Sequence, residues 1–382
     1  MNKKPEDILQ EILTSAEANK DTSVISDKEM RDRIEYICKC TTNRAGVRLL
    51  MSCLLAKIEN PEIDPRNPYT EIGTENSFSG RTYDEKYLAT FINKHRLPCN
   101  PTTAFLTPTL RNIGKPLTIE IELVGRPRKL YAESLKILDD LAKNHIDAES
   151  IFIEIIRLLI NIRDEKLARI ASLVNEIKCG EGSLPLSSES IITLIEQHLA
   201  CKNSSRLPVF IVAAAYKTAG EKLGERFLPL KSHNAADLQT GSIGDIEICL
   251  LDDDNIVTVY EMKMKKLTIN DIDAAITKIY RSNLKPHNYT FITTEIIEPE
   301  VLIYTKKLYE KTSGIEITIL DCLSFLRHFL HLFYRLKNDY LSNYQELLLN
   351  EPDSAVSQIL KEAFLILRQT AETDNELNDL SN

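Results

Sequence analysis

The spacing of apolar residues predicts a helical first part and a mixed second part of the chain. In the first 60 residues, and again from 131 to 223, apolar residues recur every three or four positions, as on one face of an amphipathic helix. Ile8, Leu9 and Ile12 are typical of this pattern. Beyond residue 130 the same period predicts helices at 131–145, 148–163, 166–178, 190–200 and 209–223.

Two segments of the first part, residues 60–81 and 97–117, have no regular period. They are interrupted by the prolines Pro61, Pro65, Pro68, Pro98, Pro101, Pro108 and Pro116. Loops of this length are usually functional or disordered, and apolar residues such as Phe105 favour ordered loops. Between the two segments, Thr82 and Glu85 fit a capping box, which predicts that a short helix begins at Thr82.

The period changes after Gly224. Apolar residues then alternate, which predicts two strands, 245–251 and 256–263, joined by the turn-forming residues 252–255. Further along, the pattern predicts strands at 289–293 and 315–320 and helices at 269–282, 300–312 and 322–347. This order of elements predicts an α/β protein of the α+β kind. A mixed central sheet is flanked by helices, and a large, mainly helical region precedes it.

The composition is that of an ordinary water-soluble protein. Of the 382 residues 43% are hydrophobic, and no apolar run approaches the roughly 18 residues that a membrane helix needs. The lysines at the start are not followed by an apolar stretch, so we expect no secretory signal, a cytoplasmic location and eight reduced cysteines. The sequence has no glycine-rich phosphate loop and no Gly-x-Ser-x-Gly motif, which argues against nucleotide-dependent enzymes and serine hydrolases.

The formal net charge of −9 argues at first sight against a nucleic-acid partner. The charges are unevenly distributed, however. Residues 348–382 carry seven acidic and two basic residues, whereas residues 94–131 carry seven basic and two acidic residues. A protein that binds one face of DNA needs a local positive surface and not a basic average. The distribution is therefore compatible with DNA binding through the first part of the chain.

The predicted hairpin carries three charged residues in an apolar setting. Asp245 stands at the head of the first strand, and Glu261 and Lys263 lie on the second. If residues 252–255 form the turn, Asp245 lies beside Met262, within one residue of the other two charged groups. Because side chains alternate between the faces of a strand, Glu261 and Lys263 share one face. The pattern therefore predicts that two carboxylates and one ammonium group converge.

These residue types suit the hydrolysis of a phosphodiester. Carboxylate oxygens bind Mg²⁺, which keeps several waters and accepts phosphate oxygens. The metal lowers the pKa of a bound water, and a neighbouring lysine orients or deprotonates the water that attacks. We expect Asp245 and Glu261 to hold Mg²⁺ and Lys263 to act on the water. Glu247, or a helix carboxylate such as Glu221, is a candidate ligand of a second metal.

A different interpretation of the hairpin is a strand pair with a solvated, salt-bridged face. Acid-x-Lys triplets also begin at Asp84, Asp164 and Glu176, but these lie on predicted helices without an acidic strand residue about 16 positions upstream. The apolar residues around the hairpin favour a central sheet instead. Charged side chains are costly there unless they are paired or bound to a metal.

The pattern Asp245…Glu261-x-Lys263 resembles the signature of the PD-(D/E)xK nuclease superfamily. The predicted order of a helix, the hairpin, a helix and a strand also resembles the core of that superfamily, although Gly244 stands where the signature has proline. More of the chain, about residues 60–295, is similar to type II restriction endonucleases of the SacI kind. The similar segments are Asp64-Pro65-Arg66, Ser79-Gly80-Arg81-Thr82, Glu149-Ser150-Ile151-Phe152, Gly244-Asp245-Ile246 and Thr258-Val259-Tyr260-Glu261.

The resemblance implies a type II site-specific deoxyribonuclease that cuts a short palindrome in both strands of DNA. It also implies a homodimer, and a modification methyltransferase that protects the host DNA. In that family the basic residue can align two positions later, so Lys265 is a rival to Lys263. The implied parts are a DNA-recognition region at 1–130, a helical connector at 131–205, a PD-(D/E)xK catalytic core at 206–347, and an acidic C-terminal helix with a frayed tail at 348–382.

The two irregular loops offer groups that can recognise DNA. Arginine and asparagine side chains bind guanine and adenine edges, and threonine hydroxyls bind phosphates. The candidates are Arg81, Arg96, Asn100, Thr102, Thr103, Arg111 and Asn112. The alternative is a polar loop whose Asn and Thr side chains only satisfy its own turns.

Two other functions stay open at the level of the sequence. A repair or recombination nuclease of the same superfamily would recognise DNA structure and give no fixed fragment pattern. A catalytically inactive DNA-binding or scaffold protein would bind DNA without a metal and without Asp245.

Overall fold

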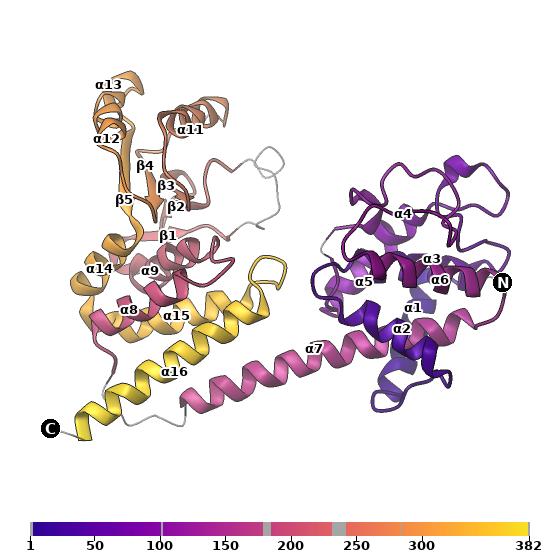
Figure 1. The fold of residues 1–382 in the computed structure, drawn as a ribbon. Helices are drawn as coiled ribbons and strands as arrows, with labels where there is room; N and C mark the ends of the chain where they lie inside the picture. The colour runs from indigo at the N-terminus through magenta and orange to yellow at the C-terminus, as the bar shows by residue number, and fades with distance from the viewer. Residues whose placement is uncertain (1–2, 101, 179–184, 231–241, 283, 381–382) are drawn as a thin grey trace. The chain divides into compact units, whose positions relative to one another are not determined.

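The computed structural model describes residues 3–100, 102–178, 185–230, 242–282 and 284–380 (Figure 1). The chain divides into two compact units, residues 1–169 (unit 1) and residues 170–382 (unit 2). Unit 1 has one hydrophobic core, and unit 2 has two hydrophobic clusters that lie on either side of a sheet.

Unit 1 is built from helices around the buried helix α3 (Ala45–Glu59), whose residues 45–56 are all buried. This helix packs against α1 (Pro5–Ala18), α2 (Lys28–Lys39) and α6 (Arg128–Ala142). The described residues between α3 and α6 form only short elements, as the prolines predict. These are η1 (Thr70–Ile72), α4 (Gly80–Thr82), η2 (Tyr83–Leu88), α5 (Ala89–Lys94) and η3 (Ala104–Leu106).

The short helical stretch in this region begins earlier than the capping pattern predicts. Its N-cap is Ser79, whose hydroxyl accepts a hydrogen bond from the Thr82 amide at 3.2 Å. Gly80 permits this start because a Cβ atom there would overlap the ring of Phe105. Thr82 therefore lies inside the helix, and the prediction that the helix begins at Thr82 is wrong.

A buried ion pair ties the irregular loop 97–117 to α3. Arg48 and Asp84 are 1% and 0% exposed, and Arg48 Nε donates to Asp84 Oδ1 at 2.7 Å. Arg48 Nη1 also donates to the backbone carbonyls of Asn100 and Thr102, at 2.6 and 2.9 Å. The guanidinium group of Arg48 thus fixes the loop by hydrogen bonds, while Asp84 neutralises its charge inside the core.

Residues 148–178 form one helix, α7 (Ala148–Lys178), where the sequence predicts two. Neither glycine nor proline interrupts the chain around Asp164, and this side chain pairs with Lys20 at 2.6 Å. The boundary between the units lies within α7. The predicted connector is accordingly divided, because α6 and the start of α7 pack into unit 1, whereas α8 (Ser188–Leu199) packs into unit 2.

The described part of unit 2 contains a five-stranded mixed sheet in the order β1-β2-β3-β4-β5. Its strands are β1 (Glu225–Phe227), β2 (Ile246–Leu250), β3 (Ile256–Lys263), β4 (Asn288–Thr293) and β5 (Glu316–Asp321). The first three strands are antiparallel neighbours, and the last three are parallel. Strands β2 to β5 lie where the sequence predicts them. The sequence did not predict β1, because three residues are too few to show a period.

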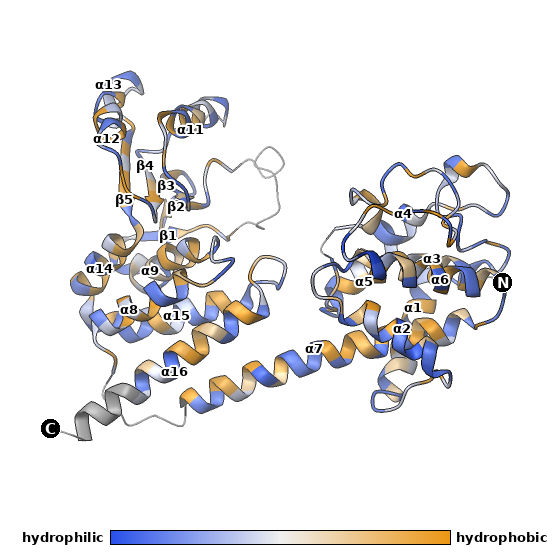
Figure 2. Cartoon of the chain, in the orientation of Figure 1, coloured by the Kyte–Doolittle hydropathy of each residue, from blue (hydrophilic) through white to orange (hydrophobic). Residues whose placement is uncertain are grey.

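Helices cover both faces of the sheet (Figure 1). One face packs against α8, α9 (Leu207–Leu223), α14 (Cys322–Leu332), α15 (Lys337–Asn350) and α16 (Gln358–Leu380). The other packs against α11 (Ile269–Ser282), α12 (Pro299–Lys306) and α13 (Leu308–Lys311). Side chains alternate between the two clusters, as Phe291 and Ile292 do, and Figure 2 shows apolar residues along β4 and β5. The predicted class, a mixed sheet flanked by helices, is confirmed.

Two predicted helices of unit 2 are each divided in the structure. Residues 299–311 form α12 and α13, and residues 322–350 form α14, η4 (Tyr334–Leu336) and α15. The last helix, α16, extends to Leu380, so the tail that was expected to fray is helical up to that residue. Among the helices that the structure describes, none is both long enough and apolar enough to span a membrane.

Candidate active site

The three charged candidates lie on the hairpin of β2 and β3. Ile246 pairs with Tyr260, and the Asp245 amide donates to the Tyr260 carbonyl at 2.8 Å. Continued by one residue, this register sets Asp245 opposite Glu261, so the predicted register is wrong by one residue. The difference arises at the turn, where Ile256 pairs with Cys249 and not with Leu251. A β-bulge beside Ile248 then reduces the difference from two residues to one before the site.

Asp245 is a half-buried carboxylate at the head of β2. Its Oδ2 accepts a hydrogen bond from the Met262 amide at 2.7 Å. Burial raises the pKa of Asp245, and the negative charge of Glu261 raises it further. The Met262 amide, Arg206 and Lys263 oppose this shift. The register sets the two carboxylates opposite each other, and a cation between them would relieve their repulsion.

Glu261 is surrounded by donors from three elements. Its Oε1 lies 2.9 Å from Nζ of Lys263, on the same strand. Its Oε2 lies 3.6 Å from Nζ of Lys278 on α11 and 3.4 Å from the hydroxyl of Tyr289 on β4. The side chains of Glu261 and Lys263 are only 15% and 21% exposed. The structure thus brings the predicted carboxylates and Lys263 together at one end of the hairpin.

The structure does not bring Lys265 or Glu221 to this group. Lys265 lies beyond the end of β3, is 72% exposed and approaches Asp271 at 3.5 Å. Glu221 is exposed at the C-terminal end of α9, whereas Arg206, whose charge acts on Asp245, lies at its N-terminal end. A rise of about 1.5 Å per residue separates positions 206 and 221 by about 22 Å. The geometry therefore favours Lys263 over Lys265 as the neighbour of the carboxylates.

Glu247, the other candidate for a second metal, is engaged in fixing the backbone. It is 5% exposed, and its Oε1 accepts from the Ile243 amide and the Ser242 hydroxyl, both at 2.9 Å. The hydroxyl of Tyr289 donates to the Ile243 carbonyl at 2.9 Å. Glu247 and Tyr289 together hold the segment that leads into Asp245. The sequence did not indicate Tyr289, because its contact depends on the parallel pairing of β3 with β4.

Gly244 has a steric reason to stand immediately before Asp245. A Cβ atom at this position would overlap the side chain of Val259 and would lie 2.8 Å from the carbonyl oxygen of Tyr260. Proline has a Cβ atom too, so the close approach of the two strands explains why proline is absent here.

The donor set fits a magnesium ion that also binds substrate. Asp245 and Glu261 offer hard carboxylate oxygens, the ligand type that Mg²⁺ prefers. The described residues contain no group of three or more His, Cys, Asp or Glu residues placed to hold a metal. Magnesium nevertheless needs only one or two carboxylates when waters and a phosphate complete its shell. Burial and, after it, the negative charge of Glu261 raise the pKa of Asp245, and a cation between the two carboxylates would favour the ionised form.

The DNA-binding candidates of unit 1 differ in their accessibility. Five are exposed, namely Arg81, Arg96, Thr102, Arg111 and Asn112. Arg81 already pairs with Glu85 at 2.8 Å, but its side chain is 54% exposed and the pair is solvated. Asn100 is half-buried, and its carbonyl oxygen accepts from Arg48.

Thr103 is the least accessible of these candidates. It is 5% exposed, and its hydroxyl donates to Asp84 Oδ2 at 2.6 Å. The same oxygen accepts from the Ala104 amide at 2.8 Å. The Thr103 hydroxyl is therefore committed to the buried ion pair and is not offered to a phosphate.

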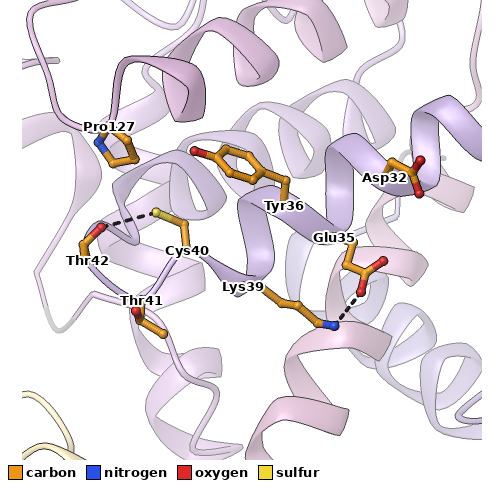
Figure 3. A pocket seen from close by; sticks show the side chains of 8 residues that line it. All are labelled: Asp32, Glu35, Tyr36, Lys39, Cys40, Thr41, Thr42 and Pro127. Atoms are coloured by element: carbon orange, nitrogen blue, oxygen red, sulfur yellow. Dashed lines mark hydrogen bonds and ion pairs between the residues drawn. The ribbon is translucent and has the colours of Figure 1, made fainter.

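Unit 1 also has an open hollow of about 520 Å³ (Figure 3). It is lined by Asp32, Glu35, Tyr36, Lys39, Cys40, Thr41, Thr42 and Pro127. Lys39 and Glu35 form an ion pair within it, and Asp32 adds a further negative charge. A hollow with two carboxylates and one ammonium group does not favour a phosphate.

Residues 183–294 match the family model of the SacI restriction endonuclease C-terminal domain. This segment is therefore similar to that family. It contains β2, β3, α11 and β4, and therefore every residue around Glu261 described above. The SacI-like resemblance is thus confirmed for the segment that carries the site, and a restriction endonuclease domain implies a nuclease that binds DNA. No curated protein matches the chain.

Proposed function

We propose that this chain is a type II restriction endonuclease that cleaves double-stranded DNA at a specific sequence with the help of Mg²⁺. The observation that carries the proposal is the convergence of Asp245, Glu261 and Lys263 within the SacI-family segment. A salt-bridged strand pair at the surface would not need two carboxylates that repel each other in a half-buried position.

Each residue of the site has a role in this proposal. Asp245 and Glu261 would hold the Mg²⁺ ion with their carboxylate oxygens. When bound, the metal polarises the scissile phosphate and lowers the pKa of a water. Lys263 orients the attacking water and balances the negative charge that grows on the phosphate oxygens. Glu247 and Tyr289 keep the segment before Asp245 in place, so that the ligands need little rearrangement.

The remaining parts of the proposal concern fold, recognition and partners. The order β2, β3, α11 and β4 supports a PD-(D/E)xK core, with the hairpin followed by a helix and a parallel strand. The exposed residues Arg96, Arg111 and Asn112 in the loops of unit 1 contact the DNA bases or backbone. Cleavage of both strands of a palindrome calls for a homodimer, working in the cytoplasm beside a methyltransferase of the same specificity.

The test is cleavage of a supercoiled plasmid by the purified full-length protein with Mg²⁺ or with EDTA. The informative variant is Asp245→Asn, which keeps an oxygen for the Met262 amide but removes the charge. Its matched control is Asp252→Asn, an exposed carboxylate on the turn of the same hairpin. We expect Asp245→Asn to slow cleavage by at least about a hundredfold and Asp252→Asn to cut as the wild type does.

The products separate this function from its alternatives. Discrete fragments with one shared end sequence support a restriction endonuclease, whereas heterogeneous ends support a structure-specific nuclease. Intact DNA with every divalent metal tried, or full cleavage by Asp245→Asn, contradicts the proposed site.

A further inference from the structure

The carboxylates of the site have positive neighbours before any metal binds. Asp245 and Glu261 supply two carboxylates, and Lys263 supplies one ammonium group at 2.9 Å from Oε1 of Glu261. Lys278 supplies a second ammonium group at 3.6 Å from Oε2 of the same carboxylate. The proposed catalytic roles include Lys263 but assign no role to Lys278.

The hydroxyl of Tyr289 does not replace Lys278 as the partner of Glu261 Oε2. This hydroxyl has one hydrogen and lies 2.9 Å from the Ile243 carbonyl but 3.4 Å from Oε2. The hydrogen therefore goes to the nearer carbonyl oxygen. The charge on Oε2 is then balanced by the ammonium group of Lys278.

Lys278 lies on helix α11, at the border between the buried and the exposed face of the helix. Ile272, Ala275 and Ile279 of this helix are buried against the sheet, whereas the side chain of Lys278 is 31% exposed. A lysine has a flexible stem and a compact charge, so its ammonium group can change partners at small cost. The contact with Glu261 is thus of a kind that a competing anion can break.

We propose that Lys278 is a resident counter-ion of Glu261, which a DNA phosphate draws away when a divalent cation takes its place. Lys278 is a positioning residue in this scheme, because it acts through Glu261. Without DNA, the cation must displace an ammonium group and is repelled by it. With DNA, the phosphate gives Lys278 another partner, so metal binding and DNA binding strengthen each other. This inference rests on the proposed function, since it takes Glu261 as a metal ligand.

The direct test is Mn²⁺ binding to the full-length protein without DNA, with free Mn²⁺ measured by electron paramagnetic resonance. Replacing Lys278 with methionine (Lys278→Met) removes the repulsion but keeps most of the length of the side chain. We expect Lys278→Met to bind Mn²⁺ about tenfold more tightly than the wild type. Lys278→Arg retains the charge and should bind Mn²⁺ as the wild type does.

The matched control is Lys266→Met. Lys266 is an exposed lysine that pairs with Glu298 at 2.7 Å, away from the carboxylates of the site. Its substitution should leave Mn²⁺ affinity unchanged. In cleavage assays Lys278→Met should require less Mg²⁺ for half-maximal rate while its maximal rate falls, and a merely structural loss would not tighten metal binding.

The outcomes distinguish this inference from the proposed function. If Glu261→Gln abolishes Mn²⁺ binding but Lys278→Met binds no more tightly than the wild type, the role of Lys278 is refuted and the metal site stands. Equal tightening in Lys278→Met and Lys266→Met also refutes it. If the wild type binds no Mn²⁺ up to millimolar concentrations, or if Glu261→Gln binds as well as the wild type, the metal site and the role of Lys278 fail together.

Discussion

Replacement of Asp84 by asparagine (Asp84→Asn) should destabilise unit 1 strongly. Asp84 is fully buried, and its carboxylate accepts hydrogen bonds from Arg48, Thr103 and Ala104. Asparagine leaves the guanidinium of Arg48 buried without a counter-charge and turns a donor toward groups that already donate. Removal of one partner of a buried ion pair costs about 3–5 kcal/mol in the free energy of unfolding.

The double variant Arg48→Met with Asp84→Leu isolates the contribution of the unpaired charge. Both charges are then absent, so this variant should be more stable than Asp84→Asn. It should still be less stable than the wild type, because the carbonyls of Asn100 and Thr102 lose the donor that Arg48 supplies. The matched control is Glu85→Gln, next in sequence, which removes only an exposed pair with Arg81 worth about 0.5 kcal/mol or less.

Urea unfolding followed by circular dichroism gives the change in stability, and hydrogen exchange read by mass spectrometry locates it. In Asp84→Asn, peptides from the loop 97–117 and α3 should lose protection while those of β3 and β4 in unit 2 keep theirs. A free energy of unfolding within about 0.5 kcal/mol of the wild type, or loss of protection confined to unit 2, would contradict this role of Asp84.

Further predictions concern unit 2. Lys263→Ala should abolish plasmid cleavage while Lys265→Ala retains most of it, and the reverse order of rates would assign the catalytic role to Lys265. His198 is buried, with both ring nitrogens hydrogen-bonded, and burial lowers its pKa from 6.5 to about 4. As the pH falls below 6.5, the unfolded chain takes up a proton at His198 while the folded state keeps the ring neutral. The contribution of His198 to the free energy of unfolding is therefore complete above pH 6.5 and declines by roughly 3 kcal/mol as the pH falls toward 4. Urea unfolding at both ends of this range should show a smaller decline in His198→Asn. Gly244→Ala should cost about 1–3 kcal/mol by overpacking and should weaken Mn²⁺ binding, because the added Cβ lies 2.8 Å from the Tyr260 carbonyl; unchanged stability and Mn²⁺ affinity would contradict this.

The sequence predicted the elements of unit 2 because their periods are local. Helix α11 has the predicted bounds. Successive side chains of β2 and β3 face opposite sides of the sheet, and this alternation is the pattern that predicts a strand. The predicted register of the hairpin is wrong because Ile256 pairs with Cys249 and not with Leu251, so the connection between the strands is longer than the turn-forming residues indicate. The sequence predicts two helices where the structure has the single helix α7, because the charged residues around Asp164 resemble a helix boundary. Neither glycine nor proline stands there, so the helix continues.

The sequence could indicate the charged residues of the hairpin but not their surroundings. Lys278 and Tyr289 reach Glu261 from another helix and another strand, and nothing in their local patterns marks that contact. Arg48 likewise has the local sequence of a helical arginine, and only the tertiary fold buries it against Asp84. Long-range ion pairs of this kind depend on packing, which a single sequence does not display.

The most direct measurement is a crystal structure of the full-length protein with Mn²⁺ in place of Mg²⁺, with the metal located by anomalous scattering. We expect a peak bonded to carboxylate oxygens of both Asp245 and Glu261, with the ammonium group of Lys263 beside it. A peak elsewhere with none at the hairpin, or the two carboxylates turned away from a common ion, would contradict it.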